Sequence, residues 1–201
     1  SNLGMLPEEI EKCRLIVVWG MNVAWSSPHG FEMLKRAANA IGTQGQSVHR
    51  VWGGTFHAFA NRVLRIYAES VGLAREFSVI DRTDAEDFLN VVRNDLGLAR
   101  KGRRFPRKAT CMDIYSRRVN STEDLRGILT TYYPWCIEWE DDLSSLFRAY
   151  VERKQSQSVL DYDDLLLYLY YLLEEPRFAA VIGGRFDHIL VDEYQDTNRI
   201  Q

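Results

Sequence analysis

The chain has 201 residues, of which 46% are hydrophobic and 26% are charged, and its formal net charge is −3. This composition is typical of a soluble globular protein and excludes a disordered or collagen-like chain. No apolar run is long enough for a membrane span, so we expect no membrane partner. The cysteines Cys13, Cys111 and Cys136 are too far apart for a zinc site or a disulfide framework, which favours a reducing cytoplasm.

The charge is distributed unevenly along the chain. Residues 93–118 carry nine basic and two acidic side chains, whereas residues 119–201 carry seven basic and sixteen acidic ones. A basic block in an acidic protein is either a solvated loop or a surface that binds phosphate groups. Charge alone favours the solvated loop.

In the first 80 residues, predicted strands and helices alternate. Runs rich in Val, Ile and Trp indicate strands, and apolar residues at helical spacing indicate helices. We expect strands at 14–19, 21–25 and 48–52, a short helix at 8–14, a helix that begins at Ser27-Pro28 and stops at Gly42, and a helix with an apolar face from Phe56 to Tyr67. Gly53-Gly54 is expected to form the turn before the last helix. This alternation is typical of a parallel α/β sheet.

The middle of the chain has a different pattern, in which only helices are expected. Residues 83–96, 121–132 and 138–155 are predicted helices, and the basic segment 99–110 is a predicted loop. Helices at 161–175 and 176–182 and a strand at 186–191 then follow. The chain therefore leaves an α/β domain, forms a helical insertion and returns to the α/β domain.

Two carboxylates directly follow the last predicted strand. Ile189-Leu190-Val191 is an apolar run typical of a buried parallel strand, and Asp192 and Glu193 come next. In open α/β sheets, ligands bind beyond the carboxyl ends of the strands. One carboxylate there can hold the Mg²⁺ of a nucleotide, and its neighbour can orient and deprotonate a water. The alternative for this pair alone is an acidic turn at the end of a strand.

Three segments together resemble a known family. Val191-Asp192-Glu193-Tyr194-Gln195-Asp196-Thr197-Asn198 is similar to the Walker B segment of the UvrD/Rep family of superfamily 1 DNA helicases. Gly54-Thr55-Phe56-His57-Ala58-Phe59-Ala60 resembles that family's DNA-contacting segment Gly-Thr-Phe-His-Ser-Phe. Leu160-Asp161-Tyr162-Asp163-Asp164-Leu165-Leu166 resembles the segment at which the family's helical 1B subdomain rejoins its 1A core. The resemblance covers roughly residues 21–201.

The resemblance implies a fold and a domain division. The expected fold class is α/β, with a partial RecA-like parallel sheet of the P-loop NTPase type and an inserted all-helical subdomain. Residues 1–82 and 157–201 would form the incomplete RecA-like core, and residues 83–156 would form the 1B-like insertion. By the same resemblance Asp192 binds the Mg²⁺ of ATP, Glu193 is the general base, and Gln195 senses the γ-phosphate.

The resemblance also implies contacts with single-stranded DNA. Thr55, Phe56 and His57 would lie along the strand, because hydroxyl and imidazole groups donate to phosphates and an aromatic ring stacks on bases. Core packing is the alternative for Phe56. Trp25 and Ser26 stand where the family has an aromatic and a hydroxyl residue, and a buried Trp at a strand end is the alternative there. Phe59 is assigned to the core.

Four residues of the basic block are further candidates for DNA contact. In this family the 1B subdomain faces the forked duplex, which changes the preferred interpretation of the block from solvated loop to phosphate contact. The candidates are Arg103, Arg104, Arg107 and Lys108.

One element of the family pattern is absent. ATP hydrolysis in the family needs Gly-x-x-x-x-Gly-Lys-Thr/Ser, and the chain contains no Gly-Lys dipeptide. Gly42-Thr43-Gln44-Gly45-Gln46-Ser47 has Gln where the lysine is required. We therefore expect a part of an ATP-dependent 3′–5′ DNA helicase that lacks the phosphate loop and the second RecA-like domain and does not hydrolyse ATP alone. A non-catalytic module that binds DNA or a partner helicase, and the helicase part of a recombination helicase-nuclease, are the alternatives.

Overall fold

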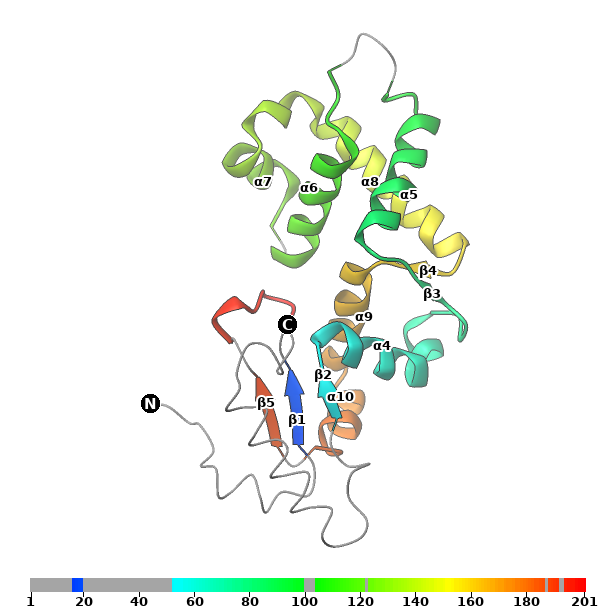
Figure 1. Cartoon of the computed structure of the whole chain (residues 1–201), viewed down its shortest axis with the longest axis vertical. Helices are drawn as coiled ribbons and strands as arrows, with labels where there is room; N and C mark the ends of the chain where they lie inside the picture. Colours follow the sequence, from blue (N-terminus) through cyan, green and yellow to red (C-terminus); the bar gives the residue numbers. More distant parts are fainter. Residues whose placement is uncertain (1–15, 20–51, 100–103, 122, 187, 192–193) are drawn as a thin grey trace, which may run out of the picture. The chain divides into compact units, whose positions relative to one another are not determined.

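The computed structural model of the chain divides into two compact units (Figure 1). The sheet unit comprises residues 1–63 and 171–197, and the helical unit comprises residues 64–170 and 198–201. The structure describes residues 16–19, 52–99, 104–121, 123–186, 188–191 and 194–201. The predicted elements at 8–14, 21–25 and 28–41 lie outside these residues.

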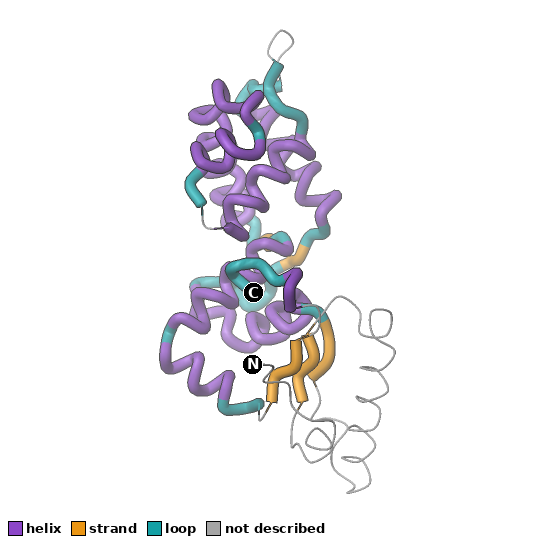
Figure 2. The backbone as a smooth tube through the Cα atoms, turned by 90° about the vertical axis from the view of Figure 1, so that its left-hand side faces the viewer, coloured by secondary structure: helices purple, strands orange, loops and turns teal. Residues whose placement is uncertain are grey.

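Three parallel strands form the centre of the sheet unit (Figures 1 and 2). They are β1 (Ile16–Trp19), β2 (Trp52–Gly54) and β5 (His188–Val191), in the order β2-β1-β5. Both pairs of neighbouring strands are parallel, which confirms the expected parallel sheet. The unit also contains α10 (Pro176–Gly183) and the short 3₁₀-helix η4 (Tyr194–Asp196).

Two helices continue from the sheet unit into the helical unit. They are α4 (Phe56–Tyr67) and α9 (Tyr162–Glu174), and the unit boundaries fall inside them. The sequence predicted the two boundaries at 82/83 and 156/157. The first of these lies after the observed boundary in α4, and the second lies before the observed boundary in α9. The division into a RecA-like core and a 1B-like insertion stays a prediction.

The helical unit is built mainly from α-helices. These are α5 (Arg82–Asp95), α6 (Lys108–Ser121), α7 (Leu125–Tyr132) and α8 (Glu140–Ser156), with the 3₁₀-helices η2 (Ala68–Val71) and η3 (Pro134–Trp139). Two N-caps begin helices where the sequence supplies an aspartate. Asp81 accepts a hydrogen bond from the backbone of Asp84 at 2.9 Å, and Asp124 accepts one from Gly127 at 2.8 Å. Leu89, Ile114 and Leu143 are among its fully buried core residues.

A second, very short parallel sheet joins the two ends of the helical insertion. It pairs β3 (Ser78–Val79) with β4 (Val159–Leu160), about 80 residues later in the chain. Backbone hydrogen bonds of 2.9 Å run from Ser78 N to the carbonyl of Ser158 and from Ile80 N to the carbonyl of Leu160. The sequence did not predict these strands, because two residues are too few to show an alternating pattern.

Most predicted helices are confirmed, but the structure corrects the expectations at several positions. Gly53 and Gly54 belong to strand β2 and do not form a turn. Residues 108–110 open helix α6 and are not part of a loop, and the helix expected from 121 begins at Leu125. Helix α6 was not predicted because its four buried residues are flanked by basic residues at both ends of the helix.

Two expected core residues are exposed. Ile189 on β5 is 56% exposed, and in the described sheet β5 pairs with β1 alone. Leu173 is 37% exposed near the end of α9, whereas Leu165, Leu166, Leu169 and Leu172 of the same helix are buried as expected. Within the described residues, no helix combines the length and the apolar character that crossing a bilayer requires.

Candidate functional site

The carboxyl edge of the three-stranded sheet brings two of the predicted motif segments together. Trp19, the last residue of β1, pairs with Gly54 on one side and with Val191 on the other. Because adjacent strands lie about 4.8 Å apart, Gly54 and Val191 are separated by roughly 10 Å, with β1 between them. Thr55 directly follows the first of these residues and Asp192 the second. The two segments therefore begin at one edge of the sheet.

Thr55 forms the N-cap of helix α4. Its hydroxyl oxygen accepts a hydrogen bond from the backbone of Ala58 at 3.2 Å, and its carbonyl accepts one from Phe59 at 3.0 Å. The residue is exposed, and a hydroxyl group that accepts one hydrogen bond can still donate its proton to a ligand. The residue can thus cap the helix and bind an anion with the same hydroxyl group.

The two residues after Thr55 form the first turn of α4. Phe56 and His57 are half-buried. Phe59 is buried and contacts Trp52 and Phe186, with ring centroids 5.8 and 5.7 Å apart, which confirms its assignment to the core. This aromatic cluster fixes the base of the helix that presents Thr55.

The candidate nucleotide ligands follow β5 in the sequence. Gln195 is exposed on η4, and Asp192 and Glu193 lie outside the described residues. Trp25 and Ser26 also lie outside them. Among the residues that the structure describes, no group of three or more His, Cys, Asp or Glu side chains could hold a metal ion. The expected Mg²⁺ ligand is not among those residues.

The basic block divides into residues with and without ionic partners. Arg104 and Arg107 are exposed and have no carboxylate partner among the described residues. Lys108, the first residue of α6, forms an ion pair with Asp87 of α5. Its charge is therefore partly neutralised, which makes it the weaker candidate for a phosphate contact. Arg103 lies outside the described residues.

A buried ionic cluster at the start of α9 was missed by the sequence analysis. Lys154 of α8 is 1% exposed, and its ammonium group lies 2.6 Å from Asp161 and 2.5 Å from Asp164. Tyr150 donates a hydrogen bond of 2.8 Å to Asp161, and Lys154 donates one of 3.3 Å to Tyr115. Lys154 follows the buried Tyr150 by one helical turn, and this position on the apolar stripe was the available signal.

The cluster contains more negative than positive charge. One ammonium group faces two carboxylates that are both buried, so the second carboxylate lacks a full countercharge. Burial, with a smaller contribution from the charge of Asp161, raises the pKa of Asp164 to about 6, although Lys154 acts in the opposite direction. Burial also raises the pKa of Tyr115 well above its usual value. The segment Leu160–Leu166 is thus held to α8 by charge as well as by packing.

Asn120 of α6 joins three segments that are distant in the sequence. Its amide nitrogen donates hydrogen bonds of 2.8 Å to Asp163 and to the carbonyl of Ser116. Its amide oxygen accepts a bond of 2.9 Å from Asn198. One side chain therefore ties the basic helix α6 to both the Leu160–Leu166 segment and the end of the Val191–Asn198 segment. Nothing in the local sequence distinguishes this residue from an ordinary surface asparagine.

A family model for the UvrD/REP helicase N-terminal domain matches residues 23–201, so the chain belongs to this family. It is 30% identical over 189 residues to DNA helicase II of Haemophilus influenzae and 32% identical over 187 residues to the ATP-dependent DNA helicase UvrD1 of Mycobacterium tuberculosis. It is 26% identical over 171 residues to the ATP-dependent DNA helicase PcrA of Staphylococcus aureus. These alignments cover 85–90% of the chain but 22–24% of the relatives. The chain therefore spans about a quarter of their length.

Proposed function

We propose that the chain is part of an ATP-dependent 3′–5′ DNA helicase or translocase, to which it contributes a partial RecA-like core and a 1B-like insertion. The observation that carries this proposal is the pairing of Trp19 with both Gly54 and Val191, in a chain that belongs to the UvrD/REP family. This pairing brings the ends of β2 and β5 to one edge of a parallel sheet, and the segments proposed to contact DNA and nucleotide follow these two ends in the sequence. Ligands of open α/β sheets bind at such an edge.

Within this proposal the Walker B segment provides the nucleotide chemistry. Asp192 would hold the Mg²⁺ that accompanies ATP, which neutralises charge on the phosphates. Glu193 would accept a proton from the attacking water, and Gln195, exposed on η4, would respond to the γ-phosphate. The chemistry fits a hard cation because the carboxylate of Asp192, which directly follows β5 in the sequence, offers oxygen ligands.

DNA binding is assigned to the start of α4 and to the free arginines of the basic block. The exposed hydroxyl of Thr55 and the side chain of His57 would contact phosphates, and Phe56 would contact a base. Trp25 and Ser26 would extend this contact. Arg104 and Arg107 would contact the phosphates of forked DNA, together with Arg103 and more weakly Lys108.

The direct test is the binding of a fluorescent oligo-dT strand to the chain, followed by anisotropy at low and moderate salt. We expect salt-sensitive binding that His57→Ala and Trp25→Ala weaken. The matched control is Gln155→Ala, which removes an exposed polar side chain at the end of α8 and should leave the affinity unchanged. No detectable binding at low salt, or equal affinities for the wild type and all three variants, would contradict the DNA assignment.

The absence of a Gly-Lys dipeptide favours one second candidate, a non-catalytic DNA-binding module derived from a helicase. Both candidates predict that the chain alone does not turn over ATP, because no lysine-bearing phosphate loop is available to hold the phosphates. The two candidates predict different ATP turnover for a longer protein that contains this chain. DNA-stimulated ATP turnover that Glu193→Gln abolishes would support the helicase, whereas turnover unchanged by Glu193→Gln would overturn the assigned role.

A further inference from the structure

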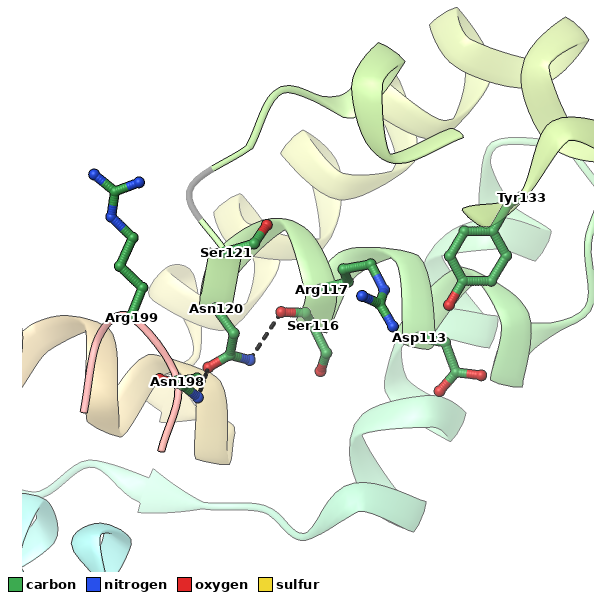
Figure 3. A pocket seen from close by; sticks show the side chains of 8 residues that line it. All are labelled: Asp113, Ser116, Arg117, Asn120, Ser121, Tyr133, Asn198 and Arg199. Atoms are coloured by element: carbon green, nitrogen blue, oxygen red, sulfur yellow. Dashed lines mark hydrogen bonds between the residues drawn. The ribbon is translucent and has the colours of Figure 1, made fainter. Parts of the chain in front are cut away.

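The last residue of the Val191–Asn198 segment is held by a side chain of the helical unit. The amide nitrogen of Asn198 donates a hydrogen bond of 2.9 Å to the amide oxygen of Asn120 on α6. Figure 3 shows the two amide groups next to each other, in the lining of a pocket that runs along α6. We call them the asparagine pair. Neither residue has a role in the function proposed above.

The orientation of the Asn120 amide is fixed by its other partners. Its nitrogen donates hydrogen bonds of 2.8 Å to the backbone carbonyl of Ser116 and to a carboxylate oxygen of Asp163. A carbonyl and a carboxylate only accept hydrogen bonds, so the nitrogen must face them and the oxygen must face Asn198. The other carboxylate oxygen of Asp163 accepts a hydrogen bond from the hydroxyl of Ser116, which holds the carboxylate in place. The acceptor that Asn198 meets is therefore positioned by α6 and α9 together.

Asn198 is constrained on its own side as well. Its amide oxygen accepts hydrogen bonds of 3.0 Å from the backbone of Ile200 and of 3.1 Å from the backbone of Gln201. This oxygen is occupied, so the nitrogen is the group that faces Asn120. Ile200 is buried and belongs to the same unit, which holds the chain end in place by packing. The asparagine pair thus joins the turn of residues 198–201 to α6 by a bond whose donor and acceptor are both determined.

The proposed γ-phosphate contact lies close to this anchor along the chain. Gln195 belongs to the sheet unit and Asn198 to the helical unit, and the three residue steps between them span at most about 11 Å. Residues 194–197 form a closed turn, in which the carbonyl of Tyr194 accepts hydrogen bonds from the backbone of Thr197 at 3.2 Å and from its hydroxyl at 2.8 Å. The contact that holds Asn198 therefore also limits where Gln195 can lie.

The chain crosses between the two units at three places, and this is the one crossing outside a helix. The other two, at 63/64 and 170/171, lie inside α4 and α9. A helix is held by its own backbone hydrogen bonds. Thr197 and Asn198 have no regular secondary structure, so their position depends on the contacts that their side chains and neighbours make. The asparagine pair is such a contact, and it is made to α6.

We propose that Asn120 is a positioning residue of the nucleotide site, which acts through Asn198 to set where Gln195 lies. The inference rests on the proposed function, because the role of Gln195 comes from there. By this contact the helical unit regulates ATP turnover. A residue that touches neither nucleotide nor DNA and acts in this way should change the rate of turnover and leave the binding of both ligands unchanged.

The anchoring step is tested in the chain itself by amide hydrogen exchange, followed residue by residue with NMR. Asn120→Ala removes the acceptor of the pair. Asn198→Asp keeps an oxygen for the backbone of residues 200 and 201 but removes the nitrogen that bonds Asn120. We expect both variants to raise the exchange rate of the hydrogen-bonded amides of Thr197 and Ile200 by about fivefold or more, because the turn opens more often.

The matched control for this experiment is Asn90→Ala. Asn90 is a half-buried asparagine of α5, and its amide oxygen accepts a hydrogen bond of 2.8 Å from Arg93 in its own helix. This variant should change the two exchange rates by less than about twofold, since it removes an amide that does not bond the chain end. Equal exchange rates in Asn120→Ala and Asn90→Ala would overturn the anchoring step.

The positioning role is tested by ATP turnover of a longer protein that contains this chain, at saturating oligo-dT. We expect Asn120→Ala and Asn198→Asp to lower kcat by about fivefold or more, with the KM for ATP and the half-saturating oligo-dT concentration changed by less than about twofold. Asn90→Ala should leave all three quantities unchanged. Circular dichroism at the assay temperature gives the folded fraction of each variant.

The outcomes separate this inference from the proposed function. A wild-type kcat in Asn120→Ala, or a kcat that falls only in proportion to the folded fraction, would overturn the positioning role and leave the proposed function intact. Wild-type protein without DNA-stimulated ATP turnover would overturn the proposed function, and the positioning role with it. Loss of oligo-dT binding in Asn120→Ala would assign this residue to DNA contact and overturn its role through Asn198.

Discussion

The ammonium group of Lys154 lies 2.6 Å from a carboxylate oxygen of Asp161 in the interior of the helical unit. Asp161 also caps the start of α9 by accepting a hydrogen bond of 2.9 Å from the backbone of Asp164. The ion pair therefore connects the end of α8 to the beginning of the next helix. A buried pair of this kind is costly to break, because either partner alone is an uncompensated charge.

Lys154→Ala is expected to lower the free energy of unfolding by about 3–5 kcal/mol, because it leaves two buried carboxylates without a countercharge. Urea unfolding followed by circular dichroism measures the change. Lys108→Ala is the control, since it removes a lysine from a solvent-exposed ion pair and should lower the free energy of unfolding far less. Equal losses for the two variants would show that the buried cluster does not stabilise the unit.

The stability of the chain should carry a pH dependence that comes from Asp164. Its pKa is raised to about 6 by burial, above the value near 4 of an aspartate in an unfolded chain. The folded state thus favours the protonated form, and the stabilisation is lost as the pH rises from 4 through 6. Over this range the unfolding free energy of the wild type should fall by up to about 3 kcal/mol relative to that of Asp164→Asn. Above pH 7 the difference between the two unfolding free energies should stay constant. A difference independent of pH would contradict the raised pKa.

Thr55 is expected to contribute to both stability and DNA binding. Thr55→Val removes the hydroxyl that caps α4, which should cost about 1 kcal/mol of unfolding free energy and weaken oligo-dT binding. Thr55→Ser should retain both properties. Asp124→Ala is the matched control, because it removes the N-cap of α7 and should reduce stability alone. Wild-type affinity in Thr55→Val would exclude this hydroxyl from the DNA site.

The cysteines of the helical unit should be unreactive in the folded chain. Burial raises the pKa of Cys111 to about 12 and also raises the pKa of Cys136. Because the thiolate is the reactive form, neither side chain should be alkylated by iodoacetamide at pH 8 until urea unfolds the protein. Peptide mass spectrometry distinguishes the two sites, and rapid labelling of Cys111 under native conditions would show that the unit opens readily.

The helices were predictable where an apolar stripe repeats at helical spacing, as along α4 and α9. Helix α6 was not, because its buried residues stand beside the arginines of the basic block, and charge was the stronger signal. The glycines before α4 suggested a turn because Gly is favoured in turns, yet β2 continues through both of them. The extended conformation of Gly53 and Gly54 follows from their pairing with β1, and this pairing cannot be predicted from the local sequence.

The motif segments of the candidate site were recognisable from the sequence because each is a continuous string of residues. The contacts that connect these segments were not recognisable. Asn120 meets Asp163 and Asn198 only because α6, α9 and the chain end converge in the folded unit. Lys154 was visible only as a lysine on an apolar stripe, and its two carboxylate partners depend on the entry of the chain into α9.

The short pairing of β3 with β4 has a consequence for the autonomy of the helical segment. Every fully buried residue of the main helical core lies between Ala85 and Tyr150, and the chain enters and leaves this region on two hydrogen-bonded neighbouring strands. The excursion is therefore a closed loop with its own core and with adjacent ends. A segment that runs from residue 77 to the end of α9 would therefore keep this core together with the buried contacts of Lys154 to Asp161 and Asp164, and these are the natural boundaries for expressing it by itself.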